Sequence, residues 1–278
     1  MPEHALLLMG GIGDFLHYLT RLPSFLKAGR CGPYGPHVFV ESVVPDQAEA
    51  VFTAAFPDLS YTFLPPSVHW VNTFPLLTPS RGRDRLNRPA RRYVEGLGFR
   101  TVTDWFLPFL CGDYEFDAAP LYRIIAGTPR RDDPYVVISA RDKGFLWWPS
   151  EEVCGEAHRL VTRSRRAVYV GTPDERVPGC GEPLTLPSVP EALALSHHAE
   201  LYVGTYTGLA TFRELTGGKN IYCVSRFRVE EVMARYAYFD EEIRRRTRSD
   251  FAFGPDDLLG LLSAELCQGE ATLPARAR

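Results

Sequence analysis

The chain has 278 residues, of which 45% are hydrophobic and 23% charged, and this composition is typical of one or two folded globular domains. Its net charge of −3 disfavours a protein that binds nucleic acid along its surface. The six cysteines form no Cys-x-x-Cys pair and no zinc-ligand spacing, so we expect reduced thiols, no metal centre and a cytoplasmic protein. No apolar run has the length of a signal peptide or a membrane span, so at most peripheral membrane contact is expected.

The first half of the chain begins with a regular alternation of strands and helices. Strands are predicted at 5–10, 37–42 and 61–64, and helices at 14–28 and 46–56. Pro23 is expected to kink the first helix or to end its first half. Residues 65–128 hold many prolines and an arginine-rich stretch at 81–92, and they predict a mixture of loops and short helices.

After a linker-like segment at 128–134 the alternation restarts. Strands are predicted at 135–139, 167–170, 201–203 and 221–224, and helices from about 150, at 188–197 and at 208–216. Residues 229–267 predict two helices broken at Gly254-Pro255. This order predicts an α/β protein with two Rossmann-like, open parallel-sheet lobes, 1–128 and 129–278. Ligand sites in such sheets lie at the carboxyl ends of the strands.

A glycine-rich turn, Gly10-Gly11-Ile12-Gly13-Asp14, follows the first predicted strand and opens the first predicted helix. Glycines let the backbone approach a ligand closely, and a helix N-terminus favours negative charge. The turn is not the dinucleotide fingerprint, because the third glycine of that pattern would fall at Leu16. Two interpretations stay open: a ligand site that includes Gly11 and Gly13, or a tight turn in which Asp14 caps the helix.

A second polar segment, Ser139-Ala140-Arg141-Asp142-Lys143, follows the strand that opens the second lobe. Two cations and a hydroxyl at a strand end suit a phosphate or a diphosphate. The alternative is a solvated charged loop. Gly171 ends the next predicted strand and is a further candidate.

A third turn, Gly204-Thr205-Tyr206-Thr207-Gly208-Leu209, lies between a predicted strand and a predicted helix. Two threonine hydroxyls and the first amides of the helix, those of Gly208 and Leu209, suit a phosphate or an oxyanion. The alternative is another tight strand-to-helix turn.

Several enzyme signatures are absent from the sequence. It contains no Asp-x-Asp, which disfavours a metal-dependent sugar transferase of that type. It also contains no Gly-x-x-x-x-Gly-Lys-Ser/Thr loop and no Gly-x-Ser-x-Gly elbow, which disfavours P-loop nucleotidases and ordinary α/β-hydrolases.

Four segments together resemble the ADP-heptose:lipopolysaccharide heptosyltransferases, which are glycosyltransferase family nine. They are 11–17 with Pro23 downstream, Trp148-Pro149, 186–194 and 199–209. The resemblance covers about the first 45 residues and 135–226. It implies a GT-B fold with a central cleft, and an inverting sugar transfer that uses a nucleotide-diphosphate sugar as co-substrate and needs no metal or other cofactor. The N-terminal lobe would bind the acceptor, and the C-terminal lobe the donor.

The resemblance also implies roles for individual residues. Asp14 falls on the general base of the family. Thr205, Thr207 and the amides of Gly208 and Leu209 would hold the diphosphate, with Lys143 or Arg141 supplying positive charge. The arginine-rich stretch would face an anionic or lipid-linked acceptor or a membrane surface, and a solvated loop is the alternative there.

Two positions depart from the family pattern. Tyr206 stands where the family has an aspartate that contacts the donor sugar, and Leu146 stands where it has a lysine. These departures leave the donor sugar open. They also leave two alternatives: a non-catalytic nucleotide-sugar-binding protein, and a nucleotide-sugar epimerase-like enzyme on the same fold.

Overall fold

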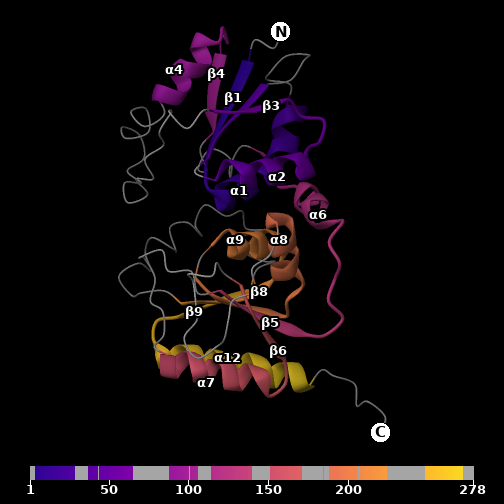
Figure 1. Cartoon of the computed structure of the whole chain (residues 1–278), viewed down its shortest axis with the longest axis vertical. Helices are drawn as coiled ribbons and strands as arrows, with labels where there is room; N and C mark the ends of the chain where they lie inside the picture. The colour runs from indigo at the N-terminus through magenta and orange to yellow at the C-terminus, as the bar shows by residue number, and fades with distance from the viewer. Residues whose placement is uncertain are drawn as a thin grey trace. The chain divides into compact units, whose positions relative to one another are not determined.

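The computed structural model divides into two compact units, Met1–Ala126 and Gly127–Arg278, and each is described by itself (Figure 1). The structure describes residues 4–28, 37–42, 44–64, 88–99, 101–105, 114–139, 151–170, 184, 188–205, 207–223 and 248–271. The predicted site residues Arg141, Lys143, Gly171 and Tyr206 lie outside the described residues, as does the arginine-rich stretch up to residue 87.

The first unit is a parallel sheet with helices on both faces. Its strands are β1 (His4–Gly10), β2 (His37–Ser42), β3 (Tyr61–Phe63) and β4 (Thr101–Trp105), in the order β3-β2-β1-β4. Its helices are α1 (Ile12–Lys27), α2 (Pro45–Ala55), α4 (Arg88–Gly96) and α6 (Ala119–Ile125). Helix α4 packs through Ala90 and Val94 against Ala5, Leu7 and Phe39 of the sheet. Helices α1 and α2 pack against the sheet and against each other, and α6 packs on both of them.

One prediction for this unit is wrong, and of the two alternatives for Pro23 the one that ends the helix is wrong. Thr101–Trp105 is a strand where only loops and short helices were expected, and it pairs with β1 in parallel register. Pro23 does not end the first helix, because α1 runs from Ile12 to Lys27 without interruption. Leu19, Leu22 and Phe25 around this proline are buried, and their packing offsets the backbone hydrogen bond that a proline cannot donate.

The second unit has five parallel strands in the order β6-β5-β7-β8-β9. They are β5 (Tyr135–Ser139), β6 (Arg166–Tyr169), β7 (Leu201–Gly204), β8 (Lys219–Cys223) and β9 (Arg248–Ala252). Its helices are α7 (Glu151–Thr162), α8 (Val189–His198), α9 (Gly208–Thr216) and α12 (Pro255–Ala271).

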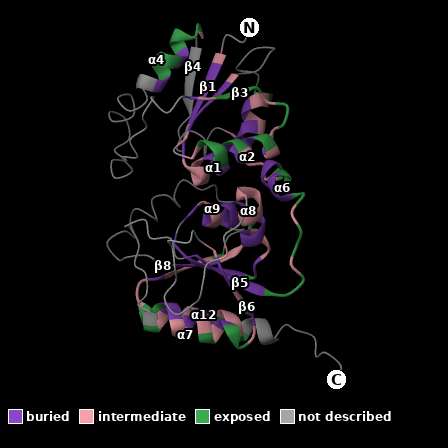
Figure 2. Ribbon diagram, viewed as in Figure 1, coloured by how far each residue is buried: buried purple, intermediate pink, exposed green. Residues whose placement is uncertain are grey.

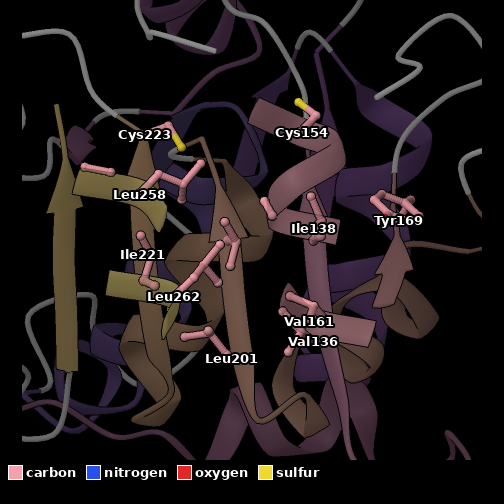
Figure 3. Close-up of a cluster of buried hydrophobic side chains, with 13 residues drawn as sticks. Val136, Ile138, Cys154, Val161, Tyr169, Leu201, Ile221, Cys223, Leu258 and Leu262 are labelled. Atoms are coloured by element: carbon pink, nitrogen blue, oxygen red, sulfur yellow. The ribbon is translucent and has the colours of Figure 1, made fainter. Parts of the chain in front are cut away.

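Both faces of this sheet are covered, so its central strands are buried along their whole length (Figure 2). On one face Val136 and Ile138 of β5 pack with Val161 of α7 and with Leu258 and Leu262 of α12 (Figure 3). On the other face the alternate β5 residues, Tyr135 and Val137, pack with residues of α8 and α9.

The prediction of a helix from residue 229 to Gly254 is wrong for its last residues. Arg248–Ala252 is the edge strand β9, in register with Lys219–Cys223 of β8. Its first three residues, Arg248-Ser249-Asp250, are charged or polar, so the sequence has no clear strand pattern there. The pairing with β8 decides its conformation.

Candidate functional site

In each sheet the strand that follows the first one in the chain pairs on one side of it, and a later strand pairs on its opposite side. In the first unit β1 is followed by β2 and β3 on one side and by β4 on the other. In the second unit β5 is followed by β6 on one side and by β7 on the other. Open parallel sheets bind ligands outside the carboxyl ends of strands at such switch points. The polar turns after β1, β5 and β7 therefore lie where a ligand site is expected.

The turn between β1 and α1 is built closely around Asp14. Gly10 has φ +147°, and a Cβ added to it would lie 2.5 Å from Asp14 Oδ2. The Gly11 amide donates a hydrogen bond to the same carboxylate oxygen at 2.9 Å. Asp14 is half-buried, as are Gly11 and Gly13. Asp14 thus caps its own helix and also lies at the switch point, so the two interpretations of this turn are compatible.

The residue one helical turn after Asp14 is a buried tyrosine. Tyr18 is 2% exposed. Burial raises its pKa well above the usual value, and the negative charge of Asp14 raises it further. The Tyr18 phenol therefore stays protonated over the physiological pH range and does not act as a base there.

A second carboxyl group, that of Glu41, is buried near the carboxyl ends of β1 and β2. It was not among the residues predicted from the sequence. It lies on β2 in register with Met9, one residue before the glycine turn, and is 6% exposed. Its Oε1 has no hydrogen-bond partner among the described residues, and burial raises its pKa to about 7. The signal available in the sequence was a glutamate near the carboxyl end of the predicted strand 37–42.

The turn between β7 and α9 is joined to the end of β5. Gly204 has φ +151°, and a Cβ added to it would overlap the Ser139 carbonyl oxygen. Gly204 is in register with Ser139, and the Thr205 amide donates to the Ser139 carbonyl at 3.4 Å. The structure therefore brings together two of the predicted segments, the end of β5 and the 204–209 turn.

Helix α9 begins directly at this turn. Thr207 is its N-cap, and the Thr207 carbonyl accepts hydrogen bonds from the Thr211 amide (2.9 Å) and hydroxyl (3.1 Å). The amides of Gly208 and Leu209 lie in the first turn of the helix, where amides have no carbonyl acceptor within the helix. Such amides, with the helix dipole behind them, favour an anion.

The other end of α9 is fastened by a buried guanidinium. Arg213 is 1% exposed, and although burial lowers its pKa to about 10 it remains positively charged at neutral pH. It donates hydrogen bonds to the carbonyl oxygens of Ser196, His197, Ala199 and Lys219 and to the side chain of Asn220. This charge holds α9 against α8 and β8, so its hydrogen-bonding capacity is used in the fold.

The described residues offer neither a metal site nor a membrane-spanning helix. They contain no cluster of three or more His, Cys, Asp or Glu side chains that could hold a metal ion. In this part of the chain, no helix combines the length and the apolar character needed to cross a membrane.

The sequence matches no protein-family model and no curated protein. The fold, in contrast, is similar to that of solved heptosyltransferases. It matches an Escherichia coli heptosyltransferase WaaC solved with ADP with a TM-score of 0.58 and 13% identity, over 96% of this chain and 98% of that one. It also matches the Escherichia coli ADP-heptose lipopolysaccharide heptosyltransferase II with a TM-score of 0.54 and 11% identity, over 96% and 99%. The resemblance is confirmed at the level of fold: two Rossmann-like parallel-sheet units of the GT-B type, as in the heptosyltransferases.

Proposed function

We propose that the protein is a glycosyltransferase that moves a sugar from a nucleotide-diphosphate donor to an acceptor hydroxyl, with inversion and without a metal ion. The observation that carries the proposal is the position of the polar turns in a GT-B fold. A carboxylate turn lies at the switch point of one sheet, and a turn that favours anions lies at that of the other.

Asp14 is the general base of the proposed reaction. Its carboxylate accepts the proton of the acceptor hydroxyl while that oxygen forms a bond to the anomeric carbon of the donor sugar. The bond from the anomeric carbon to the diphosphate breaks in the same displacement, and its electron pair stays on the diphosphate oxygen. The hydrogen bond from Gly11 keeps the carboxylate at the carboxyl end of β1.

The 204–209 turn binds the leaving diphosphate. Negative charge grows on this group as its bond breaks, and helix amides already aimed at it stabilise that charge without reorganising. The amides of Gly208 and Leu209 have this position at the start of α9. Ser139 lies beside the turn, and Arg141 or Lys143 in the following loop supplies positive charge in place of a metal.

The names of the two similar heptosyltransferase structures suggest which ligands to test first. They mention ADP and ADP-heptose, so adenine nucleotides are the first donors to test. Tyr206, at the position of the family's donor-sugar aspartate, leaves the sugar open. We propose that the acceptor is an anionic or lipid-linked glycan that a cytoplasmic enzyme can reach. The arginine-rich stretch would face this acceptor.

The proposal is tested by replacing Asp14 once a thermal-shift screen of nucleotide-diphosphate sugars has identified a donor. We expect Asp14→Ala to lower turnover by about 100- to 10,000-fold, the usual size of a general-base contribution, with an unchanged donor Kd. Turnover is measured as transfer to a panel of lipid-linked glycans and as nucleotide release. Asp46→Ala is the matched control, because Asp46 also lies in the first turn of a helix of this unit and is exposed.

Three results would contradict the scheme. Equal turnover in Asp14→Ala removes this residue from the mechanism. Donor binding without any turnover indicates a non-catalytic binding protein. Conversion of the donor with no acceptor present indicates an epimerase-like enzyme.

A chelator tests the metal-free step separately. We expect transfer to continue at an unchanged rate in EDTA after exhaustive dialysis, because the helix amides and the cations supply the positive potential. Loss of activity that returns with Mg²⁺ or Mn²⁺ would contradict a metal-free mechanism.

A further inference from the structure

Three buried tyrosines lie on one face of the second sheet, and one of them supports the 204–209 turn. Tyr135, Tyr202 and Tyr222 are each at most 2% exposed and belong to one cluster. The Tyr135 hydroxyl donates to the Leu195 carbonyl at 2.7 Å, and the Tyr222 hydroxyl donates to Glu214 Oε1 at 3.0 Å. A buried phenol needs such a partner. Two partners of the Tyr202 hydroxyl, Thr205 and Thr207, lie in the turn itself.

The Tyr202 hydroxyl connects both ends of the short segment 205–207. It donates to the Thr205 carbonyl at 2.9 Å and lies 3.1 Å from Thr207 Oγ1. Because the single phenol proton is engaged by Thr205, the Thr207 hydroxyl is the donor in the second bond. Burial raises the Tyr202 pKa to about 12, and the hydrogen bonds from Ser139 and Thr207 oppose this rise. The Tyr202 hydroxyl oxygen is thus hydrogen-bonded both to Ser139 at the end of β5 and to Thr207 at the start of α9.

This network connects Tyr202 to the first turn of α9, where the first amides of the helix lie. The Thr207 side chain is hydrogen-bonded to the Tyr202 hydroxyl, and the Thr207 carbonyl accepts hydrogen bonds from the amide and the hydroxyl of Thr211. The Thr207 hydroxyl proton points into this network, so among the described residues of the turn the backbone amides of Gly208 and Leu209 are the donors that we assign to an anion.

We propose that Tyr202 is a positioning residue that holds the 204–209 turn in the shape that binds the diphosphate of the donor. It acts through Thr205 and Thr207, because its own side chain is fully buried. This inference rests on the proposed function, in which that turn receives the diphosphate.

The test compares Tyr202→Phe with Tyr135→Phe in the full chain. Both variants lose a buried phenol hydroxyl on the same sheet face, but Tyr135 lies at the amino end of β5, away from the turn. Because the Tyr202 hydroxyl makes more hydrogen bonds than that of Tyr135, we expect Tyr202→Phe to lose at least as much thermal stability as Tyr135→Phe. We expect the Kd of ADP, measured by calorimetry, to rise about fivefold to tenfold in Tyr202→Phe, the scale of one lost hydrogen bond, and to stay unchanged in Tyr135→Phe.

A comparison of AMP with ADP separates a positioning role from a general loosening of the fold, because only ADP has the diphosphate that the turn would bind. In Tyr202→Phe the Kd of ADP should rise more than that of AMP, so the ratio of the AMP Kd to the ADP Kd should fall. The ratio should stay constant in Tyr135→Phe. Thr207→Val removes the same hydrogen bond from its other side, and this variant tests the network even where Tyr202→Phe folds poorly. The double variant should bind ADP no more weakly than the weaker of the two single variants, since both remove one shared interaction.

The outcomes distinguish this inference from the proposed function. If the wild-type protein binds neither ADP nor UDP, GDP or CDP, the diphosphate role of the turn fails, and the inference fails with it. If the wild type binds ADP and both Tyr202→Phe and Thr207→Val bind it equally well, the positioning role is overturned while the proposed function stands.

Discussion

The turn after β1 and the turn after β7 begin in the same way but are held by different parts of the protein. Each starts with a glycine at positive φ, Gly10 at +147° and Gly204 at +151°. Gly10 packs against a side chain, that of Asp14, whereas Gly204 packs against the backbone of Ser139 on the neighbouring strand. One glycine makes room for a carboxylate, and the other makes room for a second strand.

This difference corresponds to what each turn presents to a ligand. The first turn offers a side chain, the half-buried Asp14 carboxylate held by one amide. The second turn encloses its two threonine side chains: Thr205 is 0% exposed and Thr207 7%. Among its described residues, the donors that face outward are backbone amides at the start of α9. The same strand-to-helix turn can therefore present either a reactive side chain or a rigid set of main-chain donors.

Replacing the two glycines should separate these cases, and it gives the largest expected effect. Gly204→Ala forces a Cβ into the Ser139 carbonyl at a φ that side chains rarely adopt, so we expect a loss of about 3 kcal/mol or more in the free energy of unfolding. Gly10→Ala also has an unfavourable φ, and its Cβ would lie 2.5 Å from Asp14 Oδ2 and 2.6 Å from Asp14 Cβ. The carboxylate can rotate away but Asp14 Cβ can move only with the start of α1, so we expect a loss of about 2 kcal/mol, smaller than at Gly204, where the contact is with the carbonyl of a central strand. Urea unfolding measures both. Equal losses would mean that the two turns are held in the same way.

The buried carboxyl beside the first turn gives the smaller effect, and it depends on pH. Glu41 has a pKa of about 7 in the folded protein, against a reference value of 4.5. Its ionisation is thus harder in the folded state, so it costs no stability below about pH 4.5, an increasing amount up to about pH 7, and a constant amount above that. The upper limit is about 3 kcal/mol, from the size of the pKa difference.

Glu41→Gln should remove this dependence. We expect the variant to gain stability relative to the wild type as pH rises from 5 to 8, measured by urea unfolding at each pH. The exposed Glu49→Gln on α2 serves as the control for the lost charge. A stability difference between Glu41→Gln and wild type that does not change with pH would show that burial does not raise the pKa of Glu41. The turn after β1 would then have no second titrating carboxyl group beside it.

Much of the fold follows from local pattern, and the exceptions are informative. The predicted strand 37–42 and helix 208–216 have the bounds of β2 and α9, because their apolar residues and flanking turn residues are local signals. The two strands that were missed, β4 and β9, are both sheet edges. In β9, Arg248-Ser249-Asp250 are poor strand formers, and this segment is a strand because β8 offers it unpaired backbone groups. In β4 the residues other than Asp104 are threonine, valine and tryptophan, which favour strands, so a local signal was present there and was overlooked.

The same division applies to the candidate site. Asp14, Ser139, Thr205 and Thr207 could be identified from the sequence, because glycines and hydroxyls after a predicted strand are a local pattern. Tyr202 could not, since a tyrosine in a buried strand is ordinary until its hydroxyl is seen to reach Thr205 and Thr207. Glu41 could not either, because the burial that raises its pKa comes from neighbours distant in the chain.

The amino-acid sequence alone determined that glycine turns follow the first strand of one unit and the third strand of the other, because positive φ and helix starts are properties of a few consecutive residues. Only the tertiary structure decided that β5 and β7 are neighbours, which brings Ser139 and Gly204 into register across 65 residues of chain. Strand order depends on which hydrophobic faces bury each other, and that is a property of the whole sheet rather than of any segment in it.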